Sequence, residues 1–226
     1  MRYKKASKAL PILTIVFFGV SLVLFLAKTV LMTALNVMGT RSLLSAALNQ
    51  SLTTVIFAAP AVLLIVYAAL VLKKSMRAKA ILTAALGVQA LSALYYVMRI
   101  VIGSGEWKHF GKEMIYVLCF ALVALFSLIA FIFNIKGKKT GVLMILAAAA
   151  GMLVAGVLFL WNIMFMLDNS AFYAAHALNL VLRLTAYTSY AAAIVFHFVA
   201  LIIAACVKLP AKGVAVKLKM QKASEN

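Results

Sequence analysis

Acidic residues are nearly absent from this chain, which has 4 Asp and Glu residues among 226 and only 12% charged residues in all. An ordinary soluble domain has about 25% charged residues and roughly 45–50% apolar ones. Here 67% of the residues are hydrophobic, more than a water-soluble fold of this length can bury. The composition excludes an ordinary soluble domain and favours a membrane protein.

Residues that usually carry chemistry are also sparse. The two cysteines, Cys119 and Cys206, lie in apolar stretches without metal-site spacing, and they indicate no disulfide framework. The three histidines are scattered, and the chain has no HExxH, GxSxG or Gly-rich phosphate loop. We therefore expect no metal, no cofactor and no catalytic residues. An enzyme that acts on lipid headgroups through His109 or His176 is the least favoured function.

Six stretches of the chain lack any charged residue, and each is long enough to cross a bilayer as a helix. They are apolar on all sides, whereas membrane strands would alternate apolar and polar residues. The prediction is an all-α, single six-helix membrane domain over residues 1–226, ending in a short basic tail at 208–226. The helices are expected at about 9–28, 52–72, 80–102, 114–135, 141–167 and 186–207.

The basic residues indicate how these helices are oriented. Sixteen of the 22 Lys and Arg residues fall on the termini and the connections at 73–79 and 136–139, and six fall on the other side. Lys and Arg near helix ends remain on the cytoplasmic side, so both termini are predicted to be cytoplasmic. The net charge of +18 then reflects topology and attraction to anionic lipid headgroups, not nucleic acid. Short loops and a Lys-rich tail indicate a bacterial cytoplasmic membrane.

Two outer segments, 29–52 and 168–185, have an amphipathic pattern instead of a loop-like composition. Each is predicted to lie on the membrane or to extend a spanning helix. In the second segment, His176, Asn179 and Arg183 are spaced to share one helix face, and Asp168 is suited to cap a helix. These four residues and Arg99 form a predicted outer polar strip, which is either a solvated face or a surface that binds an anionic group or a partner. Arg99 is expected to reach the headgroups.

Polar side chains inside the spans are the candidate site residues, because they are costly in lipid. Gln89, Asn162 and His197 are predicted to line a small intramembrane cavity. His197 could act as a proton relay, but a hydrogen bond to a neighbouring helix is favoured, because no carboxylate lies inside a span to partner it. No carboxylate lies within the charge-free stretches, which argues against a carboxylate-based coupling to protons or sodium.

Small residues and one proline predict how the helices pack. Ala147, Gly151 and Ala155 repeat every fourth residue and form a groove that another helix can approach closely, within this chain or from another. Pro60 removes one backbone hydrogen bond and should kink the second helix.

Two functions fit this pattern. The first is a transport-type or permease-like subunit with the small polar cavity, whose basic cytoplasmic loops would meet a partner ATPase if transport is driven by one. The second is a non-transporting scaffold or regulatory subunit that binds a partner membrane protein through the small-residue groove and the outer segments.

Overall fold

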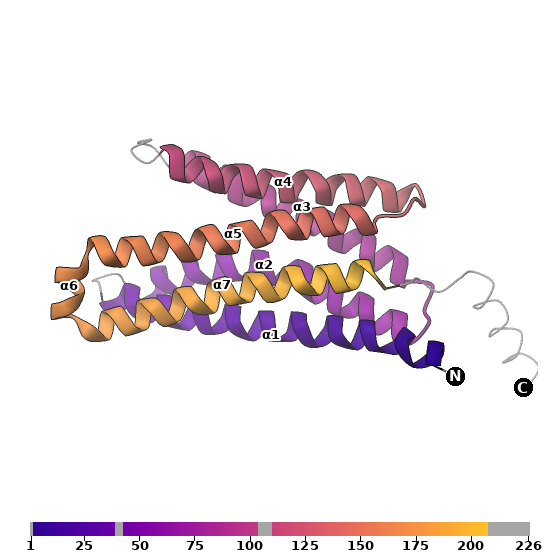
Figure 1. The fold of residues 1–226 in the computed structure, drawn as a ribbon, viewed down its shortest axis with the longest axis horizontal. Helices are drawn as coiled ribbons and strands as arrows, with labels where there is room; N and C mark the ends of the chain where they lie inside the picture. The colour runs from indigo at the N-terminus through magenta and orange to yellow at the C-terminus, as the bar shows by residue number, and fades with distance from the viewer. Residues whose placement is uncertain (1, 39–42, 104–109, 208–226) are drawn as a thin grey trace, which may run out of the picture.

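The computed structural model describes residues 2–38, 43–103 and 110–207, and the regular structure in these ranges is entirely helical (Figure 1). Six of the described helices are long and apolar enough to cross a membrane, and only α6 is not. This confirms the predicted all-α, multi-pass membrane class. The helices are α1 (Arg2–Met38), α2 (Leu43–Leu72), α3 (Ala78–Gly103), α4 (Phe110–Ile135), α5 (Gly141–Asp168), α6 (Ser170–Ala175) and α7 (Ala177–Ala205).

Three helices extend well beyond their predicted ends on the same side of the protein. α1 continues to Met38, α2 begins at Leu43 and α7 begins at Ala177. The predicted boundaries followed Lys28 and Arg183, but both side chains turn into the protein, so the helices pass through them. Of the two arrangements predicted for the outer segments, the structure shows the second: most of their described residues extend spanning helices. Among these residues, only α6 forms a separate short helix.

The six long helices form a closed ring of neighbours. Around this ring α1 packs against α2, α2 against α3, α3 against α4, α4 against α5, α5 against α7, and α7 against α1. α3 and α7 therefore lie on opposite sides of the ring. Large buried side chains such as Phe18, Phe25, Tyr67 and Phe198 fill its interior.

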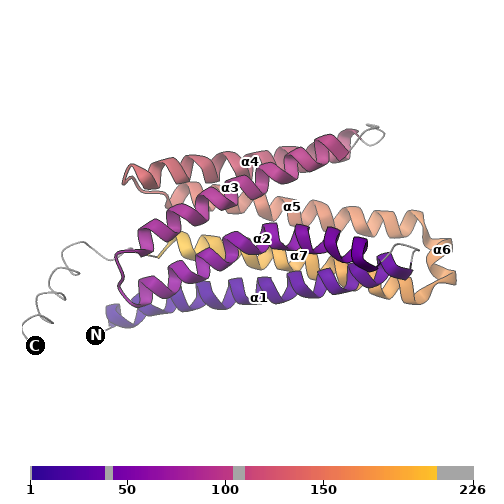
Figure 2. The ribbon, with the colours of Figure 1, turned by 180° about the vertical axis from the view of Figure 1, so that it is seen from behind.

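The two ends of the ring differ. The start of α1, the end of α7 and the turns at 73–77 and 136–140 lie at one end, and α6 lies at the other (Figure 1). We call these the inner and outer ends, following the charge distribution. The α3–α4 pair meets the other helices at the inner end and leans away from α5 and α7 towards the outer end (Figures 1 and 2).

The inner turn between α4 and α5 depends on a glycine. Gly137 has φ 72°, in the left-handed region that favours glycine. Its amide donates to the Asn134 carbonyl, and the Lys138 amide donates to the Phe133 carbonyl at 2.9 Å. This helix C-cap lets the chain reverse within a few residues and brings the start of α5 close to the end of α4.

A serine compensates for the proline in α2. Pro60 has no amide hydrogen, so the Ile56 carbonyl, one turn earlier, lacks its usual helical donor. The Ser92 hydroxyl of α3 donates to this carbonyl at 2.8 Å. Similarly, Ser21 of α1 donates to the Ala193 carbonyl of α7 at 2.8 Å. These side chains join neighbouring helices through backbone groups.

We expect Ser92→Ala to lower the free energy of unfolding by about 1 kcal/mol, because it leaves the Ile56 carbonyl without a donor from either helix. Titration of the purified protein with dodecyl sulfate measures the change. Thr185→Ala is the matched control, since the exposed Thr185 hydroxyl donates only to Val181 of its own helix. Equal stability of the two variants would contradict this role of Ser92.

Candidate functional site

A cavity of about 500 Å³ opens between α3, α4, α5 and α7 near the outer end of the ring. The ends of α3 and α5 and the beginnings of α4 and α7 supply its walls. We call it the outer chamber. Its apolar walls include Ile100, Phe120 and Leu158. Its polar lining residues are Tyr96, Tyr116, Asn162, Arg183, Tyr187 and Tyr190.

Aromatic rings hold Arg183 within the chamber. The carbon at the centre of its guanidinium lies 4.2 Å from the centroid of the Phe165 ring and 5.5 Å from that of Tyr187. Such contacts attract the cation to the ring faces and fix its plane. A guanidinium fixed in this way presents N–H donors at its edges to a planar anion such as a carboxylate or to a phosphate.

Tyrosine hydroxyl groups belong to the same chamber as this arginine. The Tyr96 and Tyr190 hydroxyls are hydrogen-bonded to each other across the ring. The Tyr116 hydroxyl is buried and has no hydrogen-bond partner among the described residues. Asn162 donates through Nδ2 to the Leu158 carbonyl of its own helix at 2.7 Å. The unpartnered Tyr116 hydroxyl gives the chamber an additional group that can donate a hydrogen bond.

Two more cations lie near the outer chamber. Lys28 of α1 is only 6% exposed, and its ammonium lies 5.1 Å from the centroid of the Tyr190 ring. Arg99 of α3 is close enough to act electrostatically on Lys28, Tyr96 and Tyr190. Cations of α1, α3 and α7 therefore lie in the outer half of the ring, where the charge rule disfavours them.

An aromatic layer closes the ring beneath the outer chamber. Phe25 stacks on Phe57 with 5.0 Å between ring centroids, Phe57 lies 4.6 Å from Tyr96, and Tyr96 stacks on Phe120 at 5.0 Å. These rings come from α1, α2, α3 and α4, so they extend across the interior. These rings fill the interior at this level with close-packed, largely apolar side chains.

Below this layer, Gln89 and His197 meet across the middle of the ring. His197 Nε2 lies 2.9 Å from Gln89 Oε1, and both side chains are buried. Because this oxygen only accepts, the imidazole carries its proton on Nε2. The other nitrogen, Nδ1, has no partner among the described residues. Phe18 and Phe198 lie edge-on to the imidazole, each with its ring centroid 5.1 Å away.

The predicted cavity of Gln89, Asn162 and His197 thus divides into two places. Gln89 and His197 are bonded to each other, whereas Asn162 lines the outer chamber. On α5 the neighbour of Phe198 is Gly151, which is 11 residues before Asn162, roughly 16 Å along a helix. The position of a residue along a helix gives its depth in the membrane only approximately. The sequence therefore could not show that Asn162 lies at a different depth from Gln89 and His197.

The Gln89–His197 bond should be visible as an energetic coupling. We expect Gln89→Leu and His197→Leu each to destabilise the protein by about 1–2 kcal/mol, since each leaves a buried polar partner unpaired. The double variant should be more stable than the sum of the two predicts, by roughly 0.5–1.7 kcal/mol. Strictly additive losses in dodecyl sulfate titration would show that the two side chains are not coupled.

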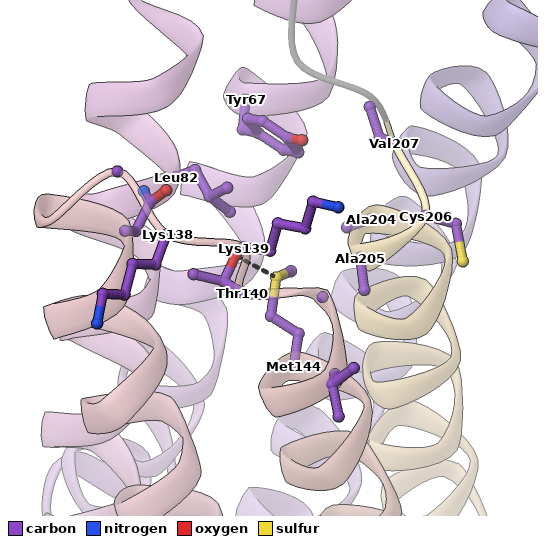
Figure 3. A pocket seen from close by; sticks show the side chains of 14 residues that line it. Tyr67, Leu82, Lys138, Lys139, Thr140, Met144, Ala204, Ala205, Cys206 and Val207 are labelled. Atoms are coloured by element: carbon purple, nitrogen blue, oxygen red, sulfur yellow. Dashed lines mark hydrogen bonds between the residues drawn. The ribbon is translucent and has the colours of Figure 1, made fainter.

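A second cavity, of about 690 Å³, lies at the inner end (Figure 3). We call it the inner chamber. It lies between the end of α2, the start of α3, the 136–140 turn, the start of α5 and the end of α7. A chamber thus lies at each end of the described part of the ring, with the aromatic layer and the Gln89–His197 pair between the two.

The residues predicted as an outer polar strip do not share one surface. Arg183 lines the outer chamber, and Asn179 is half-buried with Oδ1 unpartnered among the described residues. Asp168 is exposed at the end of α5. His176 precedes α7, stacks on Phe172 and contacts its carbonyl through Nδ1 at 3.0 Å. Arg99 is on α3, where it is exposed and is not among the residues that line the chamber. His109 lies outside the described residues.

The small-residue groove is filled from within the chain. Ala147, Gly151 and Ala155 are buried against α7, where a Cβ on Gly151 would overlap the Phe198 ring. Of the two occupants predicted for the groove, the structure shows a helix of the same chain. Among the described residues, no group of three or more His, Cys, Asp or Glu side chains could hold a metal ion.

Sequence reasoning missed the tyrosines and Lys28. Arg183, Tyr187 and Tyr190 are spaced at i, i+4 and i+7, which places them on one face of a helix. Lys28 and Arg183 look like helix ends in the sequence because they are charged.

Comparison with protein-family models, curated proteins and solved structures gives no match.

Proposed function

We propose that this protein is a transport-type, permease-like membrane protein that carries a small anionic solute through the ring. The observation that supports this most is the pair of chambers at opposite ends of a closed middle. Transport by alternating access needs a conformation in which a site reached from one face is sealed from the other.

The chemistry of the outer chamber favours an anion. Arg183 lines it, and Lys28 and Arg99 add positive charge close by. Tyrosine hydroxyls and a guanidinium donate hydrogen bonds to carboxylates, sulfonates or phosphates, and a partly apolar setting strengthens these bonds. A volume of about 500 Å³ is within the range of small-molecule sites.

In this proposal, the middle of the ring acts as the gate. The Gln89–His197 bond joins α3 to α7, and α3 belongs to the hairpin that already leans away at the outer end (Figures 1 and 2). Breaking this bond as the hairpin tilts back would open the path from within. Since the predicted spanning segments contain no carboxylate, the gradient of the solute itself would supply the energy. We place the protein in a bacterial cytoplasmic membrane with both termini inside.

The test is transport by the purified protein in liposomes. Currents or counterflow should be recorded for small anions, such as mono- and dicarboxylates, sulfate, phosphate and organic phosphates, beside amines of similar size. We expect activity with one class of anion and none with the amines. Inactivity with every anion, or equal activity with amines, would refute the proposal.

The scaffold alternative receives less support from the geometry. It relied on the small-residue groove, which α7 of the same chain occupies. The enzyme alternative relied on His109 or His176. His109 lies outside the described residues, and the exposed His176 ring stacks on Phe172.

A further inference from the structure

The inner chamber is lined by charged and polar groups that have no role in binding a solute in the outer chamber. It is open to the inner end and has a volume of about 690 Å³ (Figure 3). Its lining contains Lys138 and Lys139 but neither Asp nor Glu. Lys79 extends the positive charge around its edge, since the Lys79 ammonium lies 3.9 Å from where a Cβ on Gly137 would be.

The first turn of α5 faces this chamber. Gly141 and Val142, the first two residues of this 28-residue helix, are part of the lining. The first intrahelical bond runs from the Met144 amide to the Thr140 carbonyl, so the preceding amides have no acceptor within the helix. Thr140 does not cap them, because its hydroxyl contacts Met144 Sδ at 3.8 Å. Such amides and the helix dipole attract anions.

A buried tyrosine points independently to a ligand in the same space. Tyr67 of α2 lines the chamber with a side chain that is only 1% exposed, and it makes no hydrogen bond within the described part of the chain. Figure 3 shows its hydroxyl directed into the chamber. A tyrosine hydroxyl that opens only on a chamber can donate a hydrogen bond to a group or water held there.

One of the two lysines is positioned to complete a site. Figure 3 shows the Lys139 side chain directed into the chamber on the same side as the Tyr67 hydroxyl. Lys138 turns away, with its ammonium 5.3 Å from the centroid of the Phe133 ring. Gly141 allows the Ala205 carbonyl of α7 to lie close to the start of α5, since a Cβ would be 3.2 Å from that oxygen. This contact fixes the amides relative to the chamber.

We propose that the inner chamber binds a phosphate-type oxyanion, held by the first amides of α5, the Lys139 ammonium and the Tyr67 hydroxyl. These three kinds of donor suit the tetrahedral oxygens of a phosphate. Inorganic phosphate from the cytoplasm and the headgroup of an anionic phospholipid from the inner leaflet present the same chemistry. The inference does not depend on transport by the ring.

Two arms of one experiment distinguish these sources. In the first, the full-length protein in maltoside micelles, which contain no phosphate, is titrated with radiolabelled inorganic phosphate. In the second, protein from nanodiscs of phosphatidylcholine with phosphatidylglycerol is examined by native mass spectrometry for retained phosphatidylglycerol. Binding in the first arm identifies a soluble phosphate, and binding in the second alone identifies a lipid headgroup.

Variants test whether this chamber is the site. Lys139→Met should weaken binding by about 10- to 100-fold and Tyr67→Phe by roughly fivefold, because each removes one donor. Lys138→Met removes the same charge one residue away and should leave binding unchanged, and Tyr95→Phe is the control for the loss of a hydroxyl. Absence of binding in both arms, or equal losses in the Lys138 and Lys139 variants, would overturn the proposal.

Discussion

Gly151→Ala should lower the free energy of unfolding by about 3 kcal/mol, a large effect for one methyl group. The added Cβ would overlap the Phe198 ring, which is buried and lies beside the imidazole of His197. Neither α5 nor α7 can relax without disturbing the middle of the ring, and such overpacking costs on the order of 1–3 kcal/mol or more. Dodecyl sulfate titration of the purified variant measures the loss.

Alanine substitutions at two other glycines serve as matched controls and should not destabilise the protein. A Cβ on Gly156, further along α5, or on Gly19 of α1 would meet no atom within 4 Å. Because alanine favours helix over glycine by about 1 kcal/mol, both substitutions should be neutral or stabilising. Adding Phe198→Leu to Gly151→Ala should recover part of the loss. A Gly151→Ala variant as stable as Gly156→Ala would show that α5 and α7 do not pack as described.

Arg183→Met should weaken binding of the transported anion by at least tenfold, which corresponds to about 1.4 kcal/mol or more. Methionine keeps most of the apolar length that packs against Phe165 and Tyr187 but removes the guanidinium. The anion concentration at half-maximal counterflow in liposomes measures the effect. Arg183→Lys should recover only part of the affinity, because an ammonium lacks the planar fork of donors.

Arg77→Met is the control for this experiment. Arg77 is exposed in the inner turn between α2 and α3, so its loss changes the net charge by the same amount far from the outer chamber. It should leave the half-maximal concentration unchanged. If both arginine variants lose affinity equally, the outer chamber is not where the anion binds.

The membrane fold could be predicted because composition and length determine it almost alone. Helices such as α3, α4 and α5 begin and end within a few residues of their predicted limits, since charge, glycine or a turn marks their ends. The outer ends of α1 and α7 were predicted ten and nine residues short. Lys28 and Arg183 look like helix boundaries in the sequence. In the structure, however, their cationic groups lie over aromatic rings inside the protein, and the helices continue past them.

The candidate site was less predictable, for a related reason. Polar residues such as Gln89 and His197 are conspicuous in apolar helices, and the structure brings these two together. Tyrosines are frequent at membrane interfaces, so Tyr96, Tyr116 and Tyr190 gave no signal of a shared chamber. The three tyrosines share a chamber because of the order in which the helices pack around the ring. A single sequence carries little information about which helices are neighbours.

The central claim is that two chambers open to opposite faces of the membrane from a closed middle. Thiol labelling with a membrane-impermeant maleimide tests it most directly. Native Cys206, exposed at the inner end of α7, should react only from the inner face. Tyr187→Cys, in a Cys206→Ser background, should react only from the outer face, because Tyr187 is half-buried in the lining of the outer chamber, while buried Cys119 stays unlabelled. Labelling of Cys206 and Tyr187→Cys from the same face would contradict the account.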